Sequence, residues 1–379
     1  MSRIQEIISA LEEISKHPAQ AVQKSMEKTG KKAVGCFPLY TPEEIIYAAG
    51  MLPIGMWGGQ TEIKHADTYL QSFCCSIMRE NLEQGMRGVY DMLDAVIIPT
   101  YCDTLKCLCE NWKSAVPQVK AIPMVYPQNR VSSAGITYMI AEYSRVINEI
   151  ETLAGVEITE EELLKSIALY EGYRRIIRKF AALSGRYPQT LNTRVRHAVI
   201  KAGFFCDKKI YATMVGELLA ELKKIPSEKN QGIRVVITGI LAEPDALLET
   251  FVENGVVVVA DDLAQESRQF RTSVSKGKNA LELLAYRMAD QSCSVLYDDT
   301  KNRGTLLKDL VQETHADGVI IVMMKFCDPE EFDYPIYKKE LEEAGIPMLY
   351  LEIEQKMDSI EQIRTRIQAF TEMVNNKSY

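Results

Sequence analysis

The sequence predicts an α/β protein built from two Rossmann-like (flavodoxin-like) parallel-sheet units joined by a helical layer. In both halves of the chain, short apolar runs of strand type alternate with amphipathic helical patterns. This order is typical of parallel sheets covered by helices on both faces. Between the halves, residues 132–230 hold long helical patterns and no convincing strand. The 379 residues are enough for two or three domains.

The first half is expected to begin with a helical lead over 1–30, because apolar residues recur there at helical spacing. A first α/β domain should span 31–131, with strands in "KKAVGCFPLY", "LPIGMW", "LDAVIIPTY" and "QVKAIPMVYP". In "TPEEIIYAAG" we expect Thr41 to cap a helix, with Pro42 in its first turn and Glu44 closing a capping box.

The helical segment over 132–230 contains a second capping box, formed by Thr159 and Glu162 ahead of a long amphipathic pattern. The polar stretch "KIPSEKNQG" reads as a linker. A second α/β domain is expected over 231–379, ending in the helix "SIEQIRTRIQAFTEMV". Its expected strands are "IRVVITGI", "GVVVVADD", "CSVLYDD", "DGVIIVMMKFC" and "PMLYLEI".

Composition excludes several classes of function. The net charge is -8 and no Lys/Arg block occurs, so we expect no nucleic-acid partner. No run reaches the roughly 18 apolar residues of a membrane span, and the N-terminus lacks the apolar core of a signal peptide. These features predict a cytoplasmic protein. In a reducing cytoplasm its nine cysteines should be packing residues or metal or redox ligands rather than disulfides.

Two cysteines stand in the same local pattern. "IIPTYCDTLK" and "IVMMKFCDPEE" are apolar runs that end in Cys-Asp, at Cys102 and Cys327, ahead of a helical pattern. Ligands of open parallel sheets bind at the carboxyl ends of the strands. Asp328 is expected to be an N-cap with Pro329 at the first helical position, and Asp103 or Thr104 should cap the other helix. A helix N-terminus favours a thiolate and an anionic cluster bound to it.

Alternatives to a cluster remain at this point. Each strand-end cysteine could be a buried packing residue. A zinc knuckle is disfavoured, because Cys107-x-Cys109 is too tight and no histidine completes it. Ligands scattered over the chain suit a cluster held between two domains. Cys74 and Cys75 begin a further amphipathic helix, and spacing alone does not choose between them.

Longer motifs carry a resemblance to a known family. "GKKAVGCFPLYTPEEIIYAAGMLPIGMWGGQTE", "SFCCSIMRE", "IIPTYCDTLK", "VVADDLAQESRQFR" and "MMKFCDPEEFDYP" resemble the beta subunit of a 2-hydroxyacyl-CoA dehydratase, over about residues 1–374. The resemblance implies a heterodimer with a homologous alpha subunit, in which each partner holds a [4Fe–4S] cluster through three cysteines, with a non-protein ligand on the fourth iron. The family pattern places the ligands at Cys75, Cys102 and Cys327. It leaves Cys74 variable, and Cys107 and Cys109 at positions that are not ligands.

The activity implied by the resemblance is an oxygen-sensitive, radical dehydration of an (R)-2-hydroxyacyl-CoA to a 2-enoyl-CoA. An ATP-dependent iron–sulfur activator protein supplies one electron, which makes a ketyl radical anion of the substrate thioester. Substrate binds at the cluster of the alpha subunit, so this chain is expected to relay the electron and shape one wall of the site. A flavin is possible in the complex but is not predicted from this chain. The motifs are shared by enzymes for lactoyl, phenyllactyl, 2-hydroxyisocaproyl and 2-hydroxyglutaryl thioesters.

Two other functions fit less well. A subunit of a benzoyl-CoA-reductase or double-cubane reductase would share the fold and the electron donor. A non-catalytic two-lobed small-molecule-binding protein would share the two α/β units but hold no iron. Cys36 is expected to pack, and the histidines to lie at the surface or at helix ends. Capping or ion pairs with Arg268 and Arg271 are expected for the acidic residues near strand ends, namely Asp103, Asp261, Asp262, Glu266 and Asp328.

Overall fold

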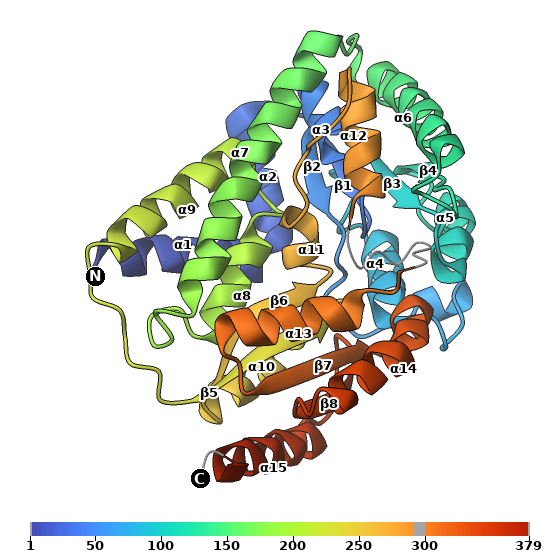
Figure 1. Ribbon diagram of the computed structural model, residues 1–379. Helices are drawn as coiled ribbons and strands as arrows, with labels where there is room; N and C mark the ends of the chain where they lie inside the picture. Colours follow the sequence, from blue (N-terminus) through green and yellow to red (C-terminus); the bar gives the residue numbers. More distant parts are fainter. Residues whose placement is uncertain (1, 292–299, 378–379) are drawn as a thin grey trace.

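A computed structural model describes residues 2–291 and 300–377 and contains two four-stranded sheets, one above the other in Figure 1. The first has the order β2-β1-β3-β4, from Leu52–Gly55, Ala33–Cys36, Ala95–Pro99 and Lys120–Met124. The second has the order β6-β5-β7-β8, from Val256–Leu263, Ile233–Gly239, Gly318–Met324 and Met348–Ile353. All neighbouring strands are parallel. Both sheets thus share the flavodoxin-type order, and the expected α/β class with two units is confirmed.

Helices surround both sheets. Those of the first half are α3 (Glu43–Ala48), the short 3-10 helix η1 (Ala66–Thr68), α4 (Ser76–Met86), α5 (Asp103–Ala115) and α6 (Ser133–Ala154). Those after β5 are α10 (Asp245–Glu253), α11 (Ser267–Phe270), α12 (Ala280–Ala289), α13 (Arg303–Thr314), α14 (Asp328–Glu343) and α15 (Glu361–Lys377). The expected strand "CSVLYDD" falls on 293–299, outside the described residues. The positions of the domain boundaries stay a prediction.

The helical layer contains α7 (Glu160–Ser184), α8 (Thr193–Ala202) and α9 (Lys208–Leu222). The N-terminal helix α1 (Arg3–Lys16) lies beside α8 and α9 (Figure 1), and its residues Ile7, Ile8 and Leu11 are buried in the same apolar cluster as those helices. The expected single lead helix is in fact two, because the chain bends at His17 and α2 (Pro18–Thr29) begins with a proline.

One of the two expected capping boxes is confirmed. Thr159 and Glu162 cap α7 reciprocally. The other is wrong: Thr41 donates its hydroxyl to the carbonyl of Phe37 at 2.9 Å, and Pro42 occupies the N-cap position without a side-chain bond. Glu44 is buried and forms an ion pair with Arg174 of α7. Glu44 therefore pairs with the neighbouring helix α7 and does not take part in a capping box of α3.

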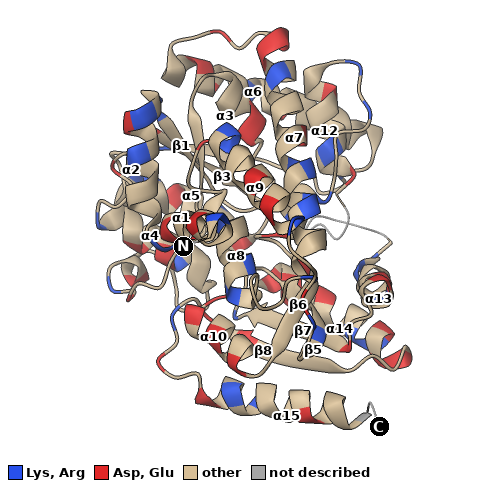
Figure 2. Ribbon diagram, turned by 90° about the vertical axis from the view of Figure 1, so that its left-hand side faces the viewer, with Lys and Arg blue, Asp and Glu red and all other residues tan. Residues whose placement is uncertain are grey.

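Acidic and basic residues occur along the same helices, as Figure 2 shows for α2 and α15. Among the described residues, no helix is both long and apolar enough to cross a bilayer.

Candidate functional site

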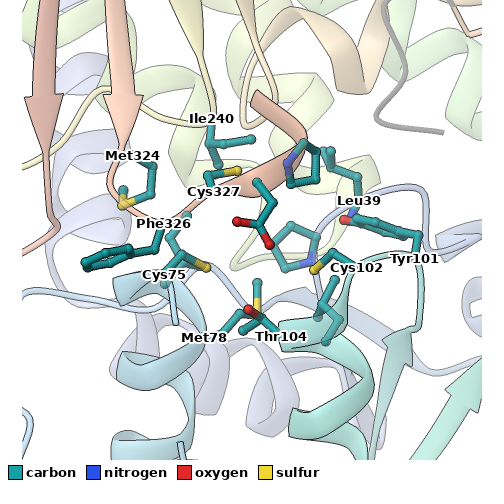
Figure 3. A pocket seen from close by; sticks show the side chains of 15 residues that line it. Leu39, Cys75, Met78, Tyr101, Cys102, Thr104, Ile240, Met324, Phe326 and Cys327 are labelled. Carbon is teal, nitrogen blue, oxygen red and sulfur yellow. The ribbon is translucent and has the colours of Figure 1, made fainter. Parts of the chain in front are cut away.

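Three cysteines stand at the starts of three helices. Cys75 is the N-cap of α4, Cys102 that of α5, and Cys327 that of α14. Cys102 follows β3 and Cys327 follows β7, so both lie at carboxyl ends of strands, one in each sheet unit. All three side chains line one pocket of about 50 Å³ (Figure 3). The fold therefore brings together thiols that are far apart in the sequence.

The expected caps of these helices are wrong. The cysteines hold the N-cap positions, so Asp103 and Asp328 are already the first helical residues and Pro329 is the second. Neither helix has a side-chain cap. Asp328 instead lines the pocket. The backbone N–H of Phe326, which has a left-handed φ of 62°, donates to Glu331 at 3.2 Å. The first turn of α14 is thus acidic, as expected, but its carboxylates do not cap the helix. Asp328 lines the pocket and Glu331 accepts a hydrogen bond from the preceding turn.

The pocket strongly favours protonated thiols. Burial raises the pKa of Cys75 to about 12 and that of Cys102 to about 11, and it raises the pKa of Cys327 well above its ordinary value. The sulfur of Cys102 also raises the pKa of Cys75, and the sulfurs of Cys75 and Cys102 raise that of Cys327. Backbone amides of the first turns, those of Met78, Leu105 and Glu330, act in the opposite direction. Three thiolates in this pocket would therefore need a positive charge beside them, such as the charge that a bound metal supplies to its thiolate ligands.

The rest of the pocket is largely apolar. Its walls include Met78 and Leu105 from the first unit and Ile240 and Met324 from the second. The segment that contains Pro38 and Leu39 forms one side. It is fixed by hydrogen bonds of the Leu39 amide to the Tyr101 hydroxyl and of the Tyr126 hydroxyl to the Tyr40 carbonyl. Such walls exclude water from whatever the thiols bind.

A buried ion network supports the helix that starts at Cys327. Glu330, in the first turn of α14, binds Arg268 at 2.7 Å and Arg303 at 2.9 Å. Arg268 also binds Asp262, at the end of β6, at 3.0 Å. The expected pairing of Asp262 with Arg268 and Arg271 is confirmed.

Other acidic residues pair differently from the expectation. Asp261 and Glu266 both bind Arg196, a residue of the helical layer that was not expected to take part. Asp103 forms an exposed pair with Lys106. Arg196 and Glu330 lack a local sequence signal, because their partners are 27 to 70 residues away.

The remaining cysteines of the described ranges 2–291 and 300–377 lie outside the pocket lining. Cys36 and Cys109 are buried, Cys107 is exposed, and Cys74 lies beside Thr104 and Cys107. The packing role expected for Cys36 fits its full burial. Among the histidines, His65 is at the surface and His315 ends α13, as expected. His197 is buried against Glu266, so the surface expectation is wrong there.

The fold and this site define a two-lobed α/β protein with three thiols at the junction of its lobes. The family described as 2-hydroxyglutaryl-CoA dehydratase, D-component, matches residues 38–374, and the chain belongs to that family.

Relatives match between 91% and 99% of this chain. The (R)-phenyllactyl-CoA dehydratase beta subunit of Clostridium sporogenes is 42% identical over 372 residues, 98% of this chain and 100% of the relative. The lactoyl-CoA dehydratase subunit beta of Anaerotignum propionicum is 43% identical over 380 residues, 99% and 100% of the two chains. A benzoyl-CoA reductase subunit of Thauera aromatica is 28% identical over 351 residues, 91% of each chain.

Proposed function

We propose that this chain is the beta subunit of a 2-hydroxyacyl-CoA dehydratase and that Cys75, Cys102 and Cys327 hold a [4Fe–4S] cluster. One observation carries the proposal. Three thiols from three helix starts and both sheet units line a single pocket, in a chain that is 42% and 43% identical over its length to two dehydratase beta subunits.

The donor set fits a cubane better than a single ion. Within the described ranges, no three His, Cys, Asp or Glu side chains converge on one metal-ion position. A cubane needs no such convergence, because each cysteine binds a different iron. The pocket lining contains three cysteines and no histidine. The fourth iron would then take a non-protein ligand.

The cluster would supply one-electron transfer, which the reaction requires. The proton lost in the dehydration is on an unactivated β-carbon, so no ordinary base removes it at neutral pH. One-electron reduction of the thioester gives a ketyl radical anion, which expels hydroxide. The β-proton of the resulting radical is then acidic, and its loss followed by return of the electron gives the 2-enoyl-CoA. The net change is loss of one water.

The residues of this chain have supporting roles in that scheme. The three cysteines would hold the cluster, the first-turn amides would offset its negative charge, and the apolar walls would keep water out. The homologous alpha subunit binds the substrate, and an ATP-dependent iron–sulfur activator delivers the electron. The relatives' designation as beta subunits supports the existence of a partner subunit.

The experiment that tests the function combines this chain with its alpha subunit, activator and ATP under anaerobic conditions. A panel of 2-hydroxyacyl-CoA thioesters is offered and 2-enoyl-CoA is measured. We expect turnover only when both subunits and the activator are present. Cys102→Ala should abolish turnover, while Cys74→Ala, a matched change next to Cys75, should keep it. Turnover by the isolated chain with activator and ATP would overturn the assignment of substrate binding to the partner.

A reductase subunit is the second candidate, favoured by the 28% identity to the benzoyl-CoA reductase subunit. The same reconstituted system separates the two functions. Loss of water from a 2-hydroxyacyl-CoA without net consumption of electrons indicates the dehydratase, whereas stoichiometric electron consumption with an aromatic acyl-CoA indicates the reductase.

A further inference from the structure

Ser76 directly follows Cys75 and joins the two sheet units. Its side chain is 4% exposed. Its hydroxyl donates to the sulfur of Met324 at 3.1 Å and accepts from the backbone N–H of Gln355 at 3.1 Å. Met324 ends β7 and Gln355 follows β8, so both partners belong to the second unit. The Ser76 hydroxyl thus donates one hydrogen bond and accepts another across the junction of the two sheet units.

Both contacts are adjacent to the candidate ligands. Ser76 is the first residue of α4 after Cys75, and Met324 precedes Cys327 by three residues on the same β7–α14 connection. Met324 also lines the thiol pocket. A shift of Ser76 relative to Met324 would therefore move the Cys75 sulfur relative to the Cys327 sulfur.

Gln355 is itself held in place by both units. Its side-chain amide donates to the carbonyl of Trp57 in the first unit at 2.7 Å and to Glu243 in the second at 2.8 Å. Gly58 packs directly on it: a Cβ at this position, where φ is 75°, would lie 2.2 Å from the Gln355 side-chain oxygen. The backbone N–H that binds Ser76 is therefore on a residue with little freedom to move.

We propose that Ser76 is a positioning residue whose hydroxyl sets the distance between the Cys75 and Cys327 thiols across the junction of the two units. The proposal rests on the proposed cluster for its functional meaning, but the arrangement of thiols that it describes exists without iron. A hydrogen-bonded hydroxyl gives a defined position, which an apolar contact alone would leave loose.

The first test uses the full chain prepared without iron and the thiol-bridging reagent dibromobimane, with bridged peptides identified by mass spectrometry. The Cys75–Cys102 bridge lies within one unit and serves as an internal standard. We expect Ser76→Ala to lower the ratio of Cys75–Cys327 to Cys75–Cys102 bridges by about fivefold, the factor for one lost buried hydrogen bond. An unchanged ratio would overturn the proposal.

Ser166→Ala is the matched control. Ser166 is 3% exposed and its hydroxyl donates to the Glu44 carbonyl at 2.8 Å, joining α7 to α3 away from the pocket. This variant should leave the bridge ratio unchanged. An equal fall in both variants would show general loosening and would also overturn the proposal. If the wild-type chain binds no iron, the proposed cluster fails, yet the bridge ratio still decides the role of Ser76.

A second test uses the iron-loaded protein and the rate of iron release to a chelator. Met324→Leu keeps the volume but removes the sulfur acceptor. If the hydroxyl acts through Met324, Ser76→Ala should speed release, Met324→Leu should speed it less, and the double variant should match Ser76→Ala alone. Rates that multiply in the double variant would show that the two residues act independently and would contradict the proposed contact.

Discussion

Arg268 and Glu330 form a fully buried ion pair, with Nη1 and Oε1 2.7 Å apart, that joins α11 to the first turn of α14. Without Arg268, Glu330 and Asp262 keep only Arg303 and Arg271 as cationic partners among the described residues, and loss of one member of a buried ion network typically costs about 3–5 kcal/mol. We therefore expect Arg268→Met to lower the free energy of unfolding by about that amount. Urea denaturation of the iron-free chain at pH 7 measures it.

The control for this prediction is an exposed pair on the same helix. Lys339 and Glu343 are 3.9 Å apart and their side chains are 77% and 67% exposed. Such pairs contribute about 0–1 kcal/mol, so Lys339→Ala should change the unfolding free energy little. A similar loss in both variants would mean that the buried network does not hold α14 in place.

Acid should destabilise the protein through its buried carboxylates. Burial would raise the pKa of Glu266, but Arg196 and His197 outweigh it and lower that pKa to about 2. Because the folded-state pKa lies below the unfolded one, the stabilisation is complete above pH 4.5 and is lost as the pH falls toward 2. Glu243 and Asp262 are shifted in the same direction. We expect the urea midpoint to fall steeply below pH 4.5, and Glu266→Gln to give a shallower slope.

Glu80 should show the opposite pH dependence. Burial raises its pKa to about 8, and only one of its side-chain oxygens accepts a hydrogen bond, from the Thr61 amide at 3.1 Å. The free energy of unfolding therefore falls as the pH rises from 4.5 to 8, by up to about 1.4 kcal/mol per pH unit. Glu80→Gln should be nearly neutral at pH 4.5 and stabilising at pH 8. A variant that is destabilised equally at both pH values would contradict the raised pKa.

Asp328 should affect the proposed cluster by its negative charge rather than by capping α14. It lines the pocket and raises the pKa of both Cys75 and Cys102. Asp328→Asn and Asp328→Ala should therefore both raise the reduction potential of the bound cluster while changing unfolding stability by no more than about 1 kcal/mol. Redox titration followed by EPR measures the shift.

Asp103 provides the matched comparison for Asp328. It too is the first helical residue after a strand-end cysteine, but its side chain is 88% exposed and pairs with Lys106 at 3.4 Å. Asp103→Asn should therefore shift the potential less than Asp328→Asn does. Iron loss in Asp328→Ala but not in Asp328→Asn would instead support a capping role.

The strands could be predicted from the sequence because each is a short apolar run, and β3 and β7 are buried throughout. The shared Cys-Asp pattern correctly indicated that Cys102 and Cys327 would lie at helix starts. The caps could not be predicted, because the local rules favour Asp328 over Cys327 as an N-cap, yet Cys327 occupies that position. In the structure the Asp328 side chain lines the pocket, a contact that depends on the tertiary fold and that the local sequence does not show.

Contacts between distant segments escaped prediction for the same reason. Ser76 and Gln355 are 279 residues apart, and neither stands in a motif that suggests a partner. Cys75 could be separated from Cys74 only by resemblance. In the structure Cys75 lines the pocket and Cys74 does not, because one residue of displacement at a helix start turns a side chain to another direction.

The central claim is that three thiols of this chain hold one cubane, and metal analysis of the anaerobically purified chain tests it most directly. We predict about four iron and four sulfide per chain for the wild type and for Cys74→Ala. Cys75→Ala, Cys102→Ala and Cys327→Ala should each lose most of both. A full complement of iron in any of these three variants, or its loss in Cys74→Ala alone, would contradict the account.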